Sequence, residues 1–309
     1  MTQKMIYKAF GLNVCSDLPL PELPKLNSKE EKVDIFIELC DLTCLWSELG
    51  EPDRFCIVKG NSVIIHIPNI AIYCIENGNN ILISPLNDTC EDQVRLYVLG
   101  SCMGALLMQR RILPLHGSAI VINDKAYAIV GDSGAGKSTL ASAFLSKGYQ
   151  LLSDDVIPIS LSNENFPLVN PAYPQQKLWQ ESLDAFGMAS NDYRPIFDRE
   201  TKFTIPVASQ FSSKTLPLAG VFELIKTEAD EIEILPTISG LQRLHTLYSH
   251  TYRNFLIDRL GIREWHFNMT AKIADQIGVY QLQRPMNRFT AHELTSLILN
   301  TINKEVIKI

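Results

Sequence analysis

The chain has 309 residues, of which 46% are hydrophobic and 20% are charged, so it can bury a substantial core and is not a disordered or fibrous protein. Its net charge of −6 argues against a nucleic-acid partner, because such partners require basic surfaces. The number of cysteines is odd and no Cys-x-x-Cys pair occurs, so we expect buried, reduced thiols. The cysteines are Cys15, Cys40, Cys44, Cys56, Cys74, Cys90 and Cys102. The first residues lack a secretory signal pattern, so we expect a cytoplasmic protein with no membrane partner.

The first part of the chain alternates between short apolar runs and turn signals. The runs on either side of Lys59-Gly60-Asn61 and of Asn77-Gly78-Asn79 predict two β-hairpins, and Val33–Leu39 alternates like a strand. We therefore expect an N-terminal antiparallel β domain over residues 1–87. It carries no catalytic signature, and both a substrate-docking role and a purely structural role are open.

A helix is expected to follow from about Glu91 to Arg110, capped by Thr89. Its stretch from Leu96 to Met108 is apolar on nearly every side but too short to span a bilayer. We interpret it as a buried helix that joins the first domain to the second expected domain, residues 88–309.

The strongest motif is a phosphate-binding loop, a glycine and four variable positions followed by Gly-Lys-Ser. An apolar strand, Ala126–Val130, precedes the loop, and helical spacing follows it. The glycines allow successive backbone N–H groups to face phosphate oxygens, the lysine reaches the β- and γ-phosphates, and the serine hydroxyl binds Mg²⁺. We therefore predict a nucleotide site made of Gly131, Asp132, Ser133, Gly134, Ala135, Gly136, Lys137, Ser138 and Thr139.

An acidic pair comes soon after the loop. The helix should end near Lys147 with Gly148 as its C-cap, and an apolar strand then runs into Asp154 and Asp155. Neighbouring side chains on a strand point to opposite faces. One aspartate can therefore meet the metal while the other faces an acceptor hydroxyl, although a solvated acidic turn is the plainer alternative.

These motifs together resemble the catalytic core of HPr kinase/phosphorylase. The likeness rests on His116-Gly117, the hairpin Ser118–Val130, the phosphate loop and Ser153-Asp154-Asp155. The whole chain resembles most closely the HPr-kinase-like proteins of lasso-peptide biosynthesis, with softer matches at Tyr7–Leu12, Asp17–Leu23, Leu96–Gly100 and Pro174–Trp179.

The resemblance implies an α/β protein whose P-loop core is HPr-kinase/PEP-carboxykinase-like. It implies ATP and Mg²⁺ as cofactors, a serine of a peptide or protein as acceptor, and leaves a homo-oligomer open. It further implies Asp154 as the proton acceptor, Asp155 with Ser138 as the metal contacts, and His116 near the transferred phosphate.

A further cation is needed on the transferred group, and the polar segment Ser190–Thr204, expected to be a loop, supplies candidates. The resemblance points to Lys202 rather than Arg199. Lys137 and Lys202 are thus the expected catalytic cations.

Two departures from the HPr kinases bear on the substrate. The segment Glu-Val-Arg-Gly-Leu-Gly is missing, with only Pro217–Glu223 nearby, and the glutamate that follows the loop serine is replaced by Thr139. We therefore expect neither HPr as the acceptor nor the reverse reaction. A kinase of a small-molecule hydroxyl is one alternative. A motor or switch ATPase is another, because Ile238–Gln242 and Phe255–Asp258 resemble the signature sequence and acidic strand of transporter ATPases.

Overall fold

The computed structural model describes residues 5–26, 32–50, 54–86, 89–196, 199–237 and 239–306. The chain divides into two compact units. The first comprises Met1–Pro114 and Tyr252–His266, and the second comprises Leu115–Thr251 and Phe267–Ile309. This division differs from the boundary expected after residue 87, since the helical stretch that follows belongs with the first sheet and the chain later returns to the first unit.

The first unit is built on a seven-stranded sheet of order β1-β2-β3-β7-β6-β5-β4. Its strands are β1 (Met5–Ala9), β2 (Leu12–Ser16), β3 (Ile35–Leu39), β4 (Cys56–Lys59), β5 (Ser62–Ile67), β6 (Ala71–Glu76) and β7 (Asn80–Pro85). Both predicted hairpins, β4–β5 and β6–β7, are confirmed. The expectation of a purely antiparallel sheet is wrong, because β3 lies between β2 and β7 and runs parallel to both. The long connection after β2 lets the chain begin β3 in the same direction.

Helices cover both faces of this sheet. On one face α1 (Thr43–Leu49) packs Leu45 and Trp46 against a cluster that includes Ile64 and Ile72. On the other, Tyr73 donates a hydrogen bond to the Val94 carbonyl of α2 (Glu91–Tyr97).

The helical stretch 91–109 is continuous, as expected, but its middle turn is a π-helix, η1 (Val98–Cys102), before α3 (Met103–Gln109). Thr89 does not cap it, because its hydroxyl donates to the carbonyls of Asn69 and Ile70.

The seven cysteines are all free. The expectation of buried thiols is confirmed for Cys15, Cys56, Cys74 and Cys102 and is wrong for Cys40, Cys44 and Cys90, which are exposed. None of the helices in the described ranges is long and apolar enough to cross a membrane.

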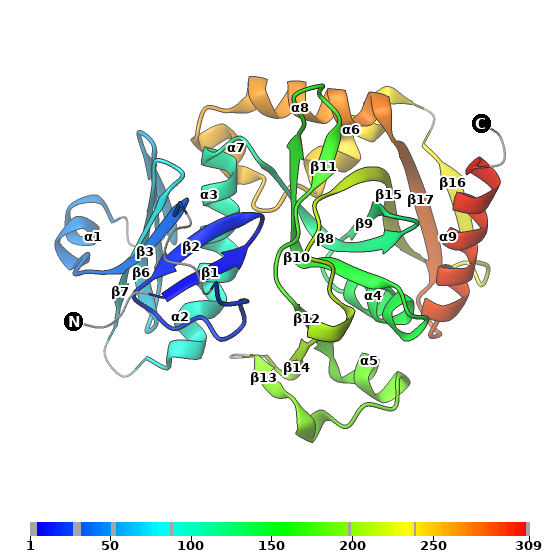
Figure 1. The fold of residues 1–309 in the computed structure, drawn as a ribbon, viewed down its shortest axis with the longest axis horizontal. Helices are drawn as coiled ribbons and strands as arrows, with labels where there is room; N and C mark the ends of the chain where they lie inside the picture. Colours follow the sequence, from blue (N-terminus) through cyan, green and yellow to red (C-terminus); the bar gives the residue numbers. More distant parts are fainter. Residues whose placement is uncertain are drawn as a thin grey trace. The chain divides into compact units, whose positions relative to one another are not determined.

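The second unit carries a seven-stranded sheet of order β11-β10-β8-β9-β15-β17-β16 (Figure 1). Its strands are β8 (Leu113–Ile122), β9 (Lys125–Gly131), β10 (Gln150–Leu161), β11 (Pro167–Val169), β15 (Leu216–Thr227), β16 (Glu233–Pro236) and β17 (Gly278–Pro285). The predicted hairpin leading to the phosphate loop is β8–β9. Strand β15 lies parallel to both β9 and β17, so the carboxyl ends of these three strands meet at one edge.

Two pairs of helices cover this sheet. Phe222 of β15 belongs to a core with Leu140 of α4 (Lys137–Ser146) and Leu294 of α9 (Ala291–Val306). The next residue, Glu223, faces the other side and accepts a hydrogen bond from Thr246 of α6 (Gly240–Ser249). Arg243 ties α6 to α8 (Arg263–Gln276) by donating to the carbonyl of Ala274.

A smaller sheet of order β12-β14-β13 stands beside α5 (Gln180–Ala185) and η2 (Ser190–Asp192). Its strands are β12 (Gln175–Trp179), β13 (Arg194–Ile196) and β14 (Arg199–Pro206). The expectation of a loop over 190–204 is therefore wrong, because the alternating Phe203 and Ile205 are buried in the core. A short helical turn, η3 (Ala208–Gln210), follows.

The features that favoured a transporter-type ATPase have other roles. Gly240 begins α6, and Ile238 lies outside the described residues. The supposed acidic strand is a helix, α7 (Phe255–Arg259).

Candidate active site

The phosphate loop lies between β9 and α4, as predicted. Gly131, Gly134 and Gly136 all have positive φ, at 149°, 77° and 105°. At Gly131 a side chain is also excluded by space, since a Cβ there would lie 2.6 Å from the carbonyl oxygen of Leu224. The loop therefore needs these glycines to turn its amides inward and to lie against β15.

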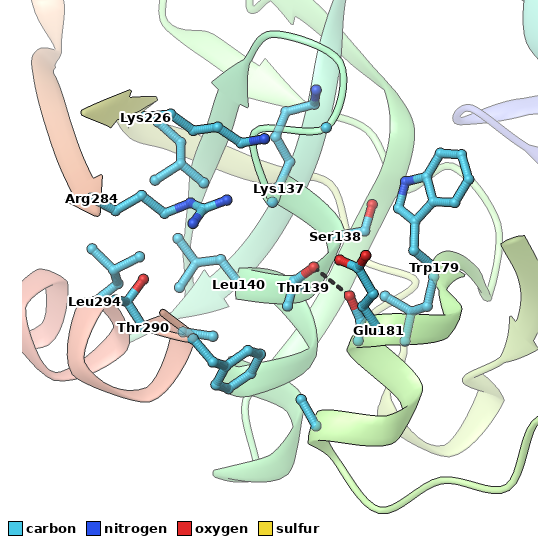
Figure 2. A pocket seen from close by; sticks show the side chains of 18 of the residues that line it. Lys137, Ser138, Thr139, Leu140, Trp179, Glu181, Lys226, Arg284, Thr290 and Leu294 are labelled. Carbon is cyan, nitrogen blue, oxygen red and sulfur yellow. Dashed lines mark hydrogen bonds between the residues drawn. The ribbon is translucent and has the colours of Figure 1, made fainter. Parts of the chain in front are cut away.

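Helix α4 is held at both ends. At its start the Thr139 hydroxyl shares a 2.8 Å hydrogen bond with the Ser182 hydroxyl of α5 (Figure 2). At its end Gly148, with φ of 87°, terminates the helix, and the amide of Tyr149 donates to the carbonyl of Phe144. This confirms that the helix stops at Gly148, although the C-cap position itself is Lys147, and the chain then passes directly into β10.

Lys137 is buried and turns back onto the loop. Its Nζ donates to the carbonyl oxygens of Gly131 and Asp132, at 2.8 and 2.9 Å. Burial lowers the pKa of Lys137, and Asp154 and Asp155 offset part of that effect. The ammonium group is therefore held at the loop by two carbonyl oxygens, and phosphate oxygens can replace them as its acceptors.

Asp154 lies under the loop and is 4% exposed. Its Oδ1 accepts hydrogen bonds from Ser118 and Ser138, at 2.5 and 2.9 Å, and its Oδ2 accepts one from the amide of Lys177 at 2.8 Å. Burial raises the pKa of Asp154, and the hydrogen bonds from Ser118, Lys177 and Ser138 counteract that rise.

Asp155 faces the other way and its side chain is 21% exposed. Its Oδ2 lies 2.7 Å from Lys177 Nζ, and its Oδ1 lies 3.5 Å from His116 Nδ1. Burial favours a higher pKa for Asp155, but Lys177, His116 and Lys202 outweigh it and hold the pKa well below its ordinary value. His116 is held by Asp155 as well, because its Nδ1 lies 3.1 Å from the Asp155 carbonyl oxygen, and burial lowers the pKa of the imidazole.

The acidic pair thus separates as predicted, but its partners differ from the expected ones. Ser138 contacts Asp154, whereas the sequence had joined Ser138 with Asp155. The strand also continues to Leu161 instead of ending at the pair, and Asp155 interrupts it with a φ of 77°. This turn in the backbone directs the second carboxylate away from the phosphate loop.

Two further lysines lie near Asp155, and only one of them was predicted. Lys202 of β14 has its Nζ 5.3 Å from the centre of the Trp179 ring. Lys177 of β12 was missed, although it lies inside the soft match Pro174–Trp179. In the sequence it stands out only as a single lysine in an otherwise uncharged segment, Gln175–Trp179. In the structure it is buried beside two carboxylates.

These residues surround a cavity of about 450 Å³ (Figure 2). Among the residues that the structure describes, six cationic side chains line it against three carboxylates, although the whole chain is acidic. The cations are Lys137, Lys177, Lys202, Lys226, Arg284 and Arg288, and the carboxylates are Asp154, Asp155 and Glu181. Such an excess of positive charge suits a polyanionic ligand.

The donor set fits Mg²⁺ bound together with a nucleotide. Ser138 and Asp154 offer oxygen atoms, which Mg²⁺ prefers. Within the described ranges no group of three or more His, Cys, Asp or Glu residues could hold a metal by itself. Mg²⁺ is usually held by one or two carboxylates plus substrate phosphates, so a site with few protein ligands agrees with this ion.

Comparison with known proteins gives distant relatives. No family model matches the chain. The HPr kinase/phosphorylases of Burkholderia lata and Paraburkholderia phymatum are each 24% identical to it over 223 residues, which cover 67% of this chain and 63% of the relative. The solved structure of the Hpr(Ser) kinase/phosphatase from Coxiella burnetii aligns with 63% of this chain and 97% of its own, at 16% identity and a TM-score of 0.33. The chain thus spans 63% of the length of its curated relatives, and it is similar in sequence, at low identity, to the HPr kinase/phosphorylases.

Proposed function

We propose that this protein transfers the γ-phosphate of Mg²⁺-ATP to a hydroxyl group, the serine of a peptide or protein. The observation that carries the proposal is the meeting of three features in one cationic cavity: the phosphate loop, a buried carboxylate bound to the loop serine, and a second carboxylate open to the cavity. The similarity to HPr kinase/phosphorylases supports the same reaction type.

In the proposed reaction the acceptor oxygen bonds to the γ-phosphorus while the bond to the β,γ-bridging oxygen breaks, and the electron pair leaves with ADP. The loop amides and Lys137 hold the phosphates. Lys177 and Lys202 stand at the open carboxylate and offset charge on the transferred group. Mg²⁺, when bound, would neutralise charge on the β- and γ-phosphate oxygens.

We assign the two aspartates by their contacts. The hydrogen bond from Ser138 supports Asp154 as the carboxylate on the metal side. The exposure of Asp155 supports it as the group that orients the acceptor hydroxyl and takes its proton. This assignment reverses the one that the resemblance implied, Asp154 as base and Asp155 as metal contact.

The acceptor we propose first is a serine in a lasso-type precursor peptide, because the softer motifs resemble the kinases of that pathway. The free cysteines support the reducing cytoplasm as the compartment of the reaction. A small-molecule hydroxyl is the second candidate.

The experiment is to incubate the full chain with Mg²⁺ and labelled ATP, separately with precursor peptides, with HPr and with small polyols. We expect a peptide to gain one phosphate by mass. The same peptide with its serine replaced by alanine is the matched control and should gain none. Release of free phosphate with no modified acceptor would instead favour an ATPase or switch protein.

A pH profile tests the pairing of Lys177 with the proposed base. Removing this cation in Lys177→Met raises the pKa of Asp155, so less of the carboxylate is ionised in mild acid. We expect the acid limb of the kcat profile to move to higher pH, with the rate falling about tenfold per pH unit below the raised pKa. Lys125→Met, at the exposed start of β9, should leave the profile in place. An unmoved acid limb in Lys177→Met would mean that Asp155 is not the titrating group.

A further inference from the structure

The catalytic groups occupy only part of the cavity. Another part of its wall comes from α4, α5 and the connection between β17 and α9, and the chemistry above does not use it. That wall carries apolar side chains beside its polar ones, among them the buried Leu140 and Leu294 and the exposed Phe289. Figure 2 shows Arg284, Thr290 and Leu294 on the opposite side of Leu140 from Trp179 and Glu181.

Arg284 is a cation at this wall that pairs with no carboxylate of the described residues. Because β17 runs parallel to β15 and β15 to β9, the carboxyl end of β17 brings Arg284 beside the phosphate loop. Its Nε donates to the carbonyl of Ala135 at 2.8 Å and one terminal nitrogen to the carbonyl of Pro285. The other terminal nitrogen lies 3.4 Å from where a Cβ of Gly136 would stand.

No carboxylate in the described part of the chain forms an ion pair with this guanidinium, and burial lowers the pKa of Arg284. A half-buried cation fixed by two carbonyls and lacking an anion is well placed to bind one from solution.

Lys226 repeats this arrangement on the neighbouring strand. It lies at the carboxyl end of β15, and its Nζ is 3.9 Å from where a Cβ of Gly134 would stand. In Figure 2 it lies on the same side of the loop as Arg284. The phosphate loop therefore has cations on the side of the apolar wall as well as on the side of Asp155.

Phe289 supplies a flat apolar surface near these cations. Its ring makes edge contacts with Phe186 at 5.5 Å and with His292 at 5.9 Å, which hold it in one orientation. It nevertheless stays 43% exposed and lines the cavity. Thr290, the next residue, is buried at the same wall, and its hydroxyl makes no hydrogen bond with any residue that the structure describes. A flat ring with an adjacent unused hydroxyl suits an aromatic base joined to a sugar.

We propose that the β17–α9 connection is the nucleoside subsite: Phe289 stacks on the base, and Arg284 binds the phosphates nearest the sugar. This inference rests on the proposed function, since it requires a nucleotide at the phosphate loop. It adds that recognition of the base comes from the chain near residue 289, far in sequence from the loop.

The test is calorimetric titration of the full chain with Mg²⁺-ATP and, separately, with Mg²⁺-tripolyphosphate, which has the phosphates but no nucleoside. Phe289→Ala should weaken ATP binding by about 10- to 100-fold, as loss of a stacked base does, and leave tripolyphosphate within about twofold. Phe289→Trp keeps an aromatic face and should retain ATP affinity. Arg284→Gln should weaken both ligands by similar factors. Phe166→Ala, an exposed aromatic outside the cavity, should change neither.

Each outcome bears on one of the two proposals. Unchanged ATP binding by Phe289→Ala, or an equal loss for tripolyphosphate, overturns the subsite. Equal affinity of the wild-type chain for both ligands also overturns it, because the nucleoside would then contribute nothing. If the wild-type chain binds neither ligand, the proposed kinase function itself fails.

Discussion

Asp155→Asn should lower the rate of phosphoryl transfer by about 10²–10⁴-fold while leaving the affinity for Mg²⁺-ATP near that of the wild type. An amide keeps the shape of the carboxylate but cannot accept the proton. The backbone should accommodate the change, because Asp155 has a φ of 77° and asparagine tolerates positive φ better than most residues. Single-turnover rates and nucleotide binding, measured separately, check the two halves of this expectation.

Asp154→Asn should also lower activity, but through weaker metal binding. It removes a negative charge beside Ser138, so metal binding should weaken and added Mg²⁺ should restore part of the activity. Asp124→Asn is the matched control, since it is an exposed aspartate that also has positive φ. Rescue by Mg²⁺ in Asp155→Asn and not in Asp154→Asn would reinstate the assignment that the resemblance implied. Full activity in both variants would remove the pair from catalysis.

Lys137→Ala should lower turnover by at least about 10²–10³-fold and weaken ATP binding, because it removes the only positive charge within the loop. The effect has a second source. In the structure Lys137 donates to the carbonyls of Gly131 and Asp132, so its loss also removes two hydrogen bonds within the loop.

Steady-state kinetics and calorimetry on Lys137→Ala measure both effects, and Lys125→Ala serves as the control for loss of an exposed lysine. A thermal melt shows whether the variant remains folded. Near-normal turnover by a folded Lys137→Ala would show that the phosphate loop is not the active site.

Local patterns predicted the parts of the site that local chemistry determines. The loop glycines and Gly148 are needed for positive φ, and each could be placed from neighbouring residues alone. Lys226 and Arg284 could not be found in this way. They reach the loop only because β9, β15 and β17 lie side by side in parallel, and such pairing joins strands distant in sequence.

Two wrong predictions have the same origin, and so does one question that the sequence leaves open. Thr89 has the residue type of a helix cap, but tertiary contacts with the carbonyls of Asn69 and Ile70 occupy its hydroxyl. Segment 190–204 has the polarity of a loop, yet β14 pairs with both β12 and β13. The division of roles between Asp154 and Asp155 depends on which of them meets Ser138, and strand alternation specifies opposite faces without saying which face is which.

The first unit is built from two separate stretches of the chain, and this affects how it can fold during translation. Arg253 and Arg259, in the second stretch, donate hydrogen bonds to the Ser101 hydroxyl and the Cys56 carbonyl in the first. A ribosome releases the chain from its N-terminus, so the first unit cannot be completed until residue 266 has emerged. By then the phosphate loop, β10 and β15 are already outside the ribosome, so the nascent chain must carry an incomplete first unit through most of its translation.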